Sequence, residues 1–223
     1  MKKYPTGITA LDSSLSGGIP SGSLILLVEK PGAGAEILTF QFAVLGLKNG
    51  EKILYVVTDD TEKNLVEYIR IYYPEANLDE NFKVISFASN ESKLFTFDPL
   101  RGLRILLSKE RFDRIIVNSM EKVVRIYSED EAITFVEELS KKVKEDEAVA
   151  MIVLTHGTCS ERFENTLKSI VDGIFEFDIR ERENEIQRIL KVIKLRRCAI
   201  PKNVFRYDIT ERGLRMESLM RVI

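Results

Sequence analysis

A glycine-containing segment between two apolar runs constrains the fold of this chain most. Residues 29–36 read Glu-Lys-Pro-Gly-Ala-Gly-Ala-Glu. The run 24–28 before them is wholly apolar, as in a buried strand, and apolar residues with helical spacing follow in 36–48. A strand, a glycine turn and a helix in this order form the loop that binds nucleotide phosphates through backbone N–H groups. The segment therefore predicts an α/β fold built around such a loop.

The loop lacks the side chains that do chemistry in a working site. The motif G-x-x-x-x-G-K-[ST] supplies a Lys that neutralises phosphates and a hydroxyl that holds Mg²⁺. Gly32 and Gly34 are present, but Glu29 takes the first Gly position, Ala35 the Lys position and Glu36 the hydroxyl position. We expect the Glu36 carboxylate to fill the empty phosphate site, because a carboxylate gains about 0.3–1 kcal/mol in the first turn of a helix. The vestigial phosphate loop comprises Glu29, Lys30, Pro31, Gly32, Ala33, Gly34, Ala35 and Glu36.

The stretch before the loop carries a more specific signal. It contains Thr6-Gly7, Leu11-Asp12, Leu15, Gly17-Gly18-Ile19-Pro20 and Gly22-Ser23. This order resembles the motif T-G-x-x-x-L-D-x-x-L-x-G-G-I-P-x-G-S of KaiC-like members of the RecA superfamily. The resemblance covers residues 1–60 and 150–217, whereas 61–110 match only in pattern. It implies a RecA-like P-loop NTPase fold with degenerate Walker A and Walker B motifs.

Apolar runs typical of strands alternate with helical patterns along the chain. Strands are predicted over 24–28, 53–58, 83–87, 113–118, 149–155, 173–179, 188–195 and 204–209, and helices over 36–48, 61–72, 98–108, 128–144 and 161–170. The alternation predicts a mainly parallel sheet with helices on both faces. The last runs, separated by short polar turns such as 181–185, predict a C-terminal antiparallel meander. Without a linker or repeat, residues 1–223 are expected to form a single domain.

The second nucleotide motif is also altered. Residues 113–119 resemble the family's D-x-x-x-x-D-S, with Asn118 where the acid should be. Asn118 is neutral and cannot supply the charge that a hard cation demands, so no metal site is expected, and a strand-end residue that bonds the next loop is the favoured interpretation. The resemblance places the family's catalytic Glu pair at Asp59 and Asp60, one methylene shorter. They are vestigial catalytic candidates or, equally, capping residues of the helix predicted from 61.

Four further residues are candidates for roles that the resemblance implies. His156, the only histidine, follows a predicted strand where a RecA-like fold can sense the γ-phosphate, although a loop residue is the simpler interpretation. Lys194 and Arg196 resemble the K-x-R pair that reaches the neighbouring subunit's nucleotide in a ring, and they could equally lie on one solvated strand face. Lys30 occupies a position where another class of P-loop proteins carries an additional lysine.

Composition excludes several classes of partner. The chain has 33 Lys+Arg against 35 Asp+Glu, a net charge of −2, so nucleic acid is not an expected partner. No apolar run approaches the roughly 20 residues that span a bilayer, and no signal-peptide pattern opens the chain, so we expect a cytoplasmic protein without a membrane partner. Cys159 and Cys198 lack metal-ligand spacing and are expected to be free thiols.

The sequence therefore predicts a catalytically inactive KaiC-like ATPase homologue, a pseudo-ATPase without cofactor. The resemblance implies a structural or regulatory module, with signal transduction as a suggested context, that binds protein partners such as active KaiC-like relatives or copies of itself. One alternative is a weak ATP-binding protein or slow Mg·ATPase that uses Asp59, Asp60 and Lys30 and is completed in trans by Lys194 and Arg196. Another is a recombination accessory protein, which lacks the basic patch with interleaved aromatic residues that such a role requires.

Overall fold

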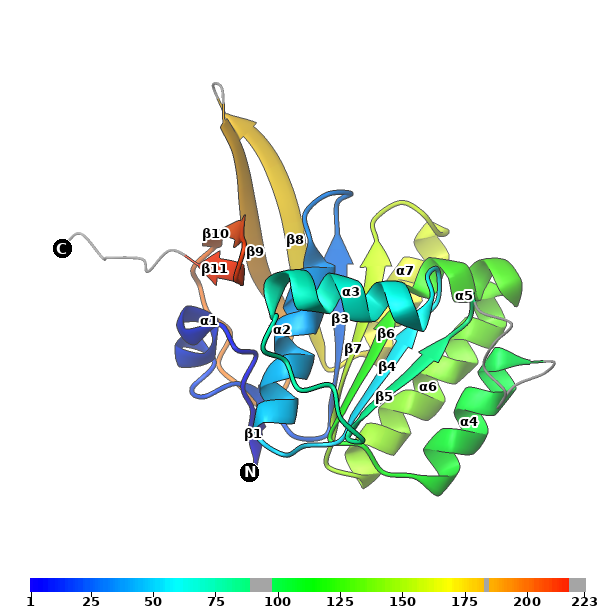
Figure 1. The fold of residues 1–223 in the computed structure, drawn as a ribbon. Coiled ribbons are helices and arrows are strands. Elements are labelled where there is room, and N and C mark those ends of the chain that lie inside the picture. Colours follow the sequence, from blue (N-terminus) through cyan, green and yellow to red (C-terminus); the bar gives the residue numbers. More distant parts are fainter. Residues whose placement is uncertain (89–97, 183–184, 217–223) are drawn as a thin grey trace.

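A nine-stranded sheet forms the centre of the computed structural model, which describes residues 1–88, 98–182 and 185–216 (Figure 1). The strand order is β11-β10-β9-β8-β3-β7-β6-β4-β5. The strands are β3 (Ser23–Glu29), β4 (Ile53–Val57), β5 (Phe82–Ser86), β6 (Arg114–Asn118), β7 (Val149–Thr155), β8 (Gly173–Arg182), β9 (Glu185–Leu195), β10 (Phe205–Thr210) and β11 (Gly213–Met216). The strands β3 to β8 are parallel, and β9 to β11 form the predicted antiparallel meander, whose turn at 181–185 lies partly outside the described residues.

Helices cover both faces of the sheet. The helices are α1 (Thr9–Ser14), α2 (Ala35–Lys48), α3 (Glu62–Tyr72), α4 (Pro99–Lys109), α5 (Met120–Ile126), α6 (Glu129–Glu145) and α7 (Glu161–Ile170). Buried side chains of α1, α2 and α3 join one apolar cluster, and those of α4 to α7 join a second cluster on the opposite face. The predicted α/β architecture is therefore confirmed. Within the described residues no helix is long and apolar enough to cross a membrane.

The N-terminal motif folds around one carboxylate. Asp12 Oδ1 accepts hydrogen bonds from the backbone N (2.7 Å) and Oγ1 (2.8 Å) of Thr6, and Asp12 Oδ2 accepts one from Gly7 N (3.1 Å). Gly18 lies so close to the short strand β1 (Lys3–Tyr4) that a Cβ there would come within 2.5 Å of Tyr4 O. Gln41 Nε2 donates to Gly7 O at 2.6 Å, which ties the motif to α2. The motif thus positions the helix that follows the loop.

One buried arginine was not anticipated as a structural residue. Arg114 at the start of β6 is fully buried, and its Nε lies 2.5 Å from Glu51 Oε2. Its Nη1 donates to Pro5 O (2.9 Å) and Phe42 O (2.8 Å), and its guanidinium lies 4.1 Å from the centroid of the Phe42 ring. Arg114 therefore joins the N-terminal segment, α2 and the sheet in one charge-assisted network.

Candidate functional site

The carboxyl ends of four parallel strands meet at one edge of the sheet. Glu29 ends β3, Asp59 and Asp60 follow β4, Asn118 ends β6, and His156 follows β7. This edge is where α/β sheets bind ligands. It holds a cavity of about 410 Å³. The cavity is lined by Glu29, Glu36, Phe40, Val57, Asp59, Asp60, Leu65, Tyr68, Asn118, Ser119 and Thr155.

The carboxylate of Glu29 accepts hydrogen bonds from the backbone N–H groups of the loop. Glu29 Oε2 accepts hydrogen bonds from Gly34 N at 3.1 Å and from Ala35 N at 2.9 Å. These are the N–H groups at the start of α2 that would face a phosphate. Burial raises the pKa of Glu29, the bond from Ala35 opposes that shift, and the nearby charge of Glu36 adds to it. An internal anion thus stands where the ligand anion would bind.

The expectation that Glu36 fills this site was wrong. Glu36 points into the acidic cavity, and its carboxylate makes no hydrogen bond to any residue in the described ranges. Burial raises its pKa, and the neighbouring charge of Asp59 raises it further. Glu29 binds these N–H groups because it precedes the turn, so its side chain reaches across the loop to them. Glu36 already lies inside the helix.

Side chains from β8, β9 and β10 fix the shape of the loop. Lys30 Nζ lies 2.5 Å from Asp178 Oδ1 on β8, and this hydrogen bond lowers the pKa of Asp178. Arg188 Nε on β9 donates to Gly32 O at 3.3 Å, and Tyr207 Oη on β10 donates to Ala33 O at 2.7 Å. Lys30 is therefore engaged with β8 and does not replace the missing lysine. Pro31 completes the turn between these contacts.

The two aspartates have different roles. Asp60 Oδ1 accepts from Thr61 N (2.7 Å) and from Asn64 Nδ2 (2.6 Å), and Thr61 caps α3 by accepting from Asn64 N at 3.2 Å. Asp60 thus supports the start of the helix. Asp59 is exposed, lines the cavity and has no side-chain hydrogen bond to the residues that the structure describes. Of the two aspartates, Asp59 is therefore the one whose carboxylate is available to a ligand or partner.

Asn118 belongs to a buried polar network. Its Nδ2 donates to Tyr55 Oη at 3.4 Å, and Tyr55 Oη lies 2.7 Å from Thr39 Oγ1 on α2. Burial raises the pKa of Tyr55 strongly, so this phenol stays protonated. The amide thus bonds Tyr55 on β4, and through that phenol it is linked to α2, whereas the sequence interpretation had placed its bond in the next loop. In the described part of the chain, no group of three or more His, Cys, Asp or Glu is arranged to hold a metal ion.

His156 lies beside the loop but its ring is engaged elsewhere. Its backbone N donates to Glu29 O at 2.8 Å, and its Nδ1 lies 3.1 Å from Glu164 Oε2. Glu164 is buried and also accepts from Gly157 N at 2.7 Å. Sequence reasoning missed Glu164, whose only signal was an acidic residue in the first turn of a helix after the strand. The pair holds the loop after β7, and the γ-phosphate sensor role stays a prediction.

Lys194 and Arg196 lie at the opposite edge of the sheet from the loop. Because β9 is antiparallel to β8, its end is level with Gly173, the start of β8. Lys194 Nζ donates to Lys168 O (2.9 Å) and Ser169 O (3.3 Å), and Arg196 Nη1 lies 3.4 Å from Asp172 Oδ1. Neither reaches the loop of its own chain, so any role in trans stays a prediction.

A fifth carboxylate lies close to the cavity. Glu121 on α5 accepts a hydrogen bond from Thr155 N through Oε1, and its Oε2 is buried without a hydrogen-bond partner among the described residues. The charge of Glu121 also raises the pKa of Glu29. The lining of the cavity contains four acidic side chains and no basic one. The negative charge of the site therefore disfavours the binding of a polyphosphate.

Comparisons with known proteins agree with this architecture. A family model described as the KaiC ATPase matches residues 4–219. The chain is 26% identical to a UPF0273 protein of Pyrococcus furiosus, over 96% of this chain and 93% of the relative. It is 26% identical to the DNA repair protein RadA of Aquifex aeolicus, over 96% of this chain and 46% of RadA. It is 22% identical to the circadian clock oscillator protein KaiC of Thermosynechococcus vestitus, over 98% of this chain and 43% of KaiC.

A solved structure shares the fold. The KaiC-like protein of the hyperthermophilic archaeon Pyrococcus horikoshii superimposes with a TM-score of 0.80 at 18% identity, covering 97% of this chain and 99% of that protein. The match to the family model spans nearly the whole chain and begins at the N-terminal motif built around Asp12. This chain therefore belongs to the KaiC family of ATPases.

Proposed function

We propose that this chain is a KaiC-like domain that has lost nucleotide binding and acts as a structural or regulatory interaction module. The observation that carries the proposal is the Glu29 carboxylate, which accepts hydrogen bonds from Gly34 N and Ala35 N. A ligand phosphate would have to displace this internal anion. It would find Ala35 where the motif places its lysine and Asn118 where the motif places its acid.

Magnitudes support the loss of binding. The missing lysine removes a charge-assisted contact of roughly 1.5–3 kcal/mol. At about 4 Å and an effective dielectric constant near 20, each contact between a phosphate charge and a carboxylate costs on the order of 4 kcal/mol before screening. Glu29, Glu36 and Asp59 all line the cavity. Repulsion of this size outweighs the backbone N–H contacts that the loop can still offer.

Calorimetric titration and thermal unfolding with Mg·ATP and Mg·ADP test the proposal. We expect no heat of binding and no rise in Tm. A ligand at 100 times its Kd stabilises a protein by about 2.7 kcal/mol, so even weak binding is visible at millimolar nucleotide. A clear, saturable rise in Tm with Mg·ATP would contradict the proposal.

The cavity mouth is the surface that we propose for a protein partner. It combines the free carboxylate of Asp59 with Tyr68 of α3, which is 51% exposed. A basic segment of an active KaiC-like relative complements this surface in charge and offers an apolar contact to the tyrosine. Asp59→Lys with Tyr68→Ala should abolish co-elution with such a relative, whereas Ile126→Ala, an exposed apolar residue on α5, should not. Light scattering of the chain alone separates this from self-association.

One alternative is a slow ATPase completed in trans. One observation favours it: Asp59 is free in the cavity. Lys194 and Arg196 lie at the opposite edge of the sheet from the loop, so they could act only on the site of a neighbouring subunit. Hydrolysis per subunit should then rise with protein concentration and disappear in a Lys194→Ala, Arg196→Ala variant. The same assay at high concentration shows no turnover if the domain is inactive.

A further inference from the structure

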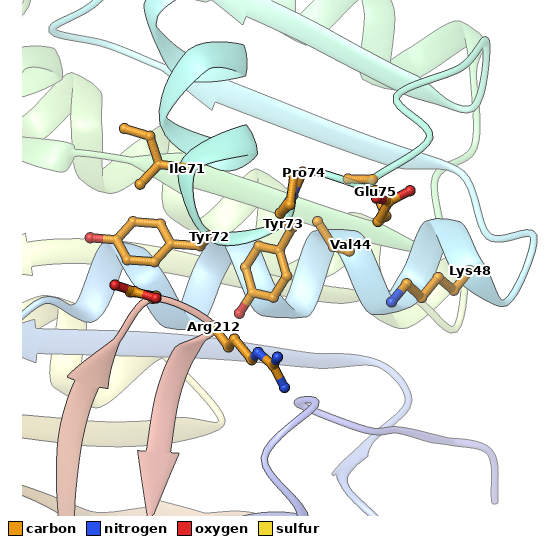
Figure 2. A pocket seen from close by; sticks show the side chains of 10 residues that line it. Val44, Lys48, Ile71, Tyr72, Tyr73, Pro74, Glu75 and Arg212 are labelled. Atoms are coloured by element: carbon orange, nitrogen blue, oxygen red, sulfur yellow. The ribbon is translucent and has the colours of Figure 1, made fainter.

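A second cavity lies away from the phosphate loop. Its volume is about 610 Å³, within the range of small-molecule sites. Three elements enclose it: the second half of α2, the end of α3 with the segment after it, and the turn between β10 and β11 (Figure 2). Val44, Tyr72 and Pro74 give it an apolar and aromatic wall. None of these residues lines the cavity at the loop.

A tyrosine whose phenol is buried beneath the β10–β11 hairpin lines this cavity. Tyr73 lines it, and the buried Oη makes no hydrogen bond to any residue of the described ranges. The Tyr73 ring points toward the β10–β11 hairpin, which carries Arg212 (Figure 2). The hairpin passes so close that a Cβ on Gly213 would overlap with Tyr73 Oη. Burial raises the pKa of Tyr73 and keeps the phenol protonated.

Two cations flank the phenol. Lys48 at the end of α2 and Arg212 on the hairpin line the cavity, and neither forms an ion pair within the part of the chain that the structure describes. Glu75 and Glu211 also line it, likewise without a described ion pair. The formal charge of the lining is therefore balanced. This balance disfavours a polyanion such as a triphosphate but permits a single negative charge held between the two cations.

We propose that this cavity binds a small organic molecule with a planar apolar body and one anionic group. The body lies against Tyr72, Val44 and Pro74, and the anionic group accepts hydrogen bonds from Lys48 and Arg212. The inference is independent of the function proposed above, because it uses other residues, at the other end of α2 from the loop.

Two fluorescent probes test this proposal. 1-Anilinonaphthalene-8-sulfonate carries the aromatic body and one sulfonate, and N-phenyl-1-naphthylamine carries the same body without the charge. We expect the sulfonate probe to bind the intact chain at one site, and the neutral probe to bind more weakly. Lys48→Gln with Arg212→Gln should weaken sulfonate binding about tenfold, a factor that corresponds to about 1.4 kcal/mol of lost charge-assisted contacts. Binding of the neutral probe should not change.

Two further variants make the test decisive. Tyr73→Phe keeps the ring that lines the cavity and removes the buried hydroxyl, so it should fold normally and change neither probe. Arg101→Gln with Lys109→Gln removes the same charge from exposed positions on α4 and should change neither probe. Equal binding of both probes, or sulfonate binding that survives the Lys48/Arg212 variant, would overturn the proposal.

Discussion

Glu29 Oε2 lies 2.9 Å from Ala35 N, so the first residue of the vestigial loop bonds its seventh. The backbone donors of the loop are thus bound by one of its own side chains and not by a ligand. Glu29 stands where the motif has its first glycine, so this one difference both removes a glycine and supplies an anion.

Removal of the Glu29 side chain should destabilise the start of α2. Glu29→Ala leaves Gly34 N and Ala35 N without their acceptor, and loss of a comparable helix cap costs about 0.5–2 kcal/mol. Glu29→Gln keeps an acceptor oxygen and should retain most of the stability. Urea unfolding at neutral pH measures both. Equal stability of Glu29→Ala and the unmodified chain would show that the observed bonds contribute little.

Glu36→Gln should raise stability at neutral pH. The folded-state pKa of Glu36 is raised by burial and by Asp59, so its stabilising contribution is full below the unfolded pKa, near 4.5, and is lost as pH rises through the folded pKa. The variant should therefore be more stable at pH 7, and the difference should vanish near pH 4. Thermal unfolding across this range measures it.

Asp98 is a control, because its contribution to stability should depend on pH in the opposite direction to that of Glu36. The backbone N–H of Arg101 and the phenol of Tyr127 lower the pKa of Asp98, which caps α4. Its contribution is present above the unfolded pKa and is lost as pH falls through the folded pKa. Asp98→Asn should thus destabilise the chain at pH 7 and matter less in acid. Two variants with the same pH profile would contradict this assignment.

Arg114→Ala should be the most damaging of the substitutions considered. It leaves Glu51 without its partner and removes one donor from each of two backbone carbonyls, and breaking a buried pair typically costs about 3–5 kcal/mol. Arg101→Gln on the exposed face of α4 is the matched loss of one charge and should shift stability by less than about 0.5 kcal/mol. Chemical unfolding of the two variants compares them directly.

Nucleotide binding should return when the loop is rebuilt. Glu29→Gly with Ala35→Lys, Glu36→Thr and Asn118→Asp removes the internal anion and restores the lysine, the hydroxyl and the strand-end acid. Calorimetry should show Mg·ATP binding, with hydrolysis recovered later or not at all. The triple variant Ala35→Lys, Glu36→Thr, Asn118→Asp, which retains Glu29, should bind Mg·ATP far more weakly. A folded quadruple variant that binds nothing would show that contacts from Arg188 and Tyr207 hold the loop in a closed shape.

Sequence patterns predicted the framework well because the framework depends on local signals. The predicted helix over 36–48 and strand over 149–155 match α2 and β7, and the order of strands and helices follows from their alternation. The short helices α1 and α5 were not predicted, since segments of six and seven residues give little periodicity. The motif around Asp12 identified the family, which fixed the fold.

The site was harder to predict because its geometry comes from residues distant in sequence. Glu29 and Glu36 are both acidic residues beside the loop, so the sequence pattern did not distinguish them. The choice between them depends on which side chain reaches the backbone N–H groups. The partners of Lys30 and His156, Asp178 and Glu164, could not be identified without the pairing of β8 and the placement of α7. Arg114 was predicted within its strand, but its burial against Glu51 was not.

The bond from Tyr207 Oη to Ala33 O has a consequence for the order in which the protein is made. These residues are 174 positions apart, so the loop leaves the ribosome long before the strand that holds it. Contacts of such separation form late, because chain closure must come first. The loop near the beginning of the chain therefore takes its final shape only when the last strands have been synthesised and paired, and a chain ending before residue 205 would carry its phosphate loop unfinished.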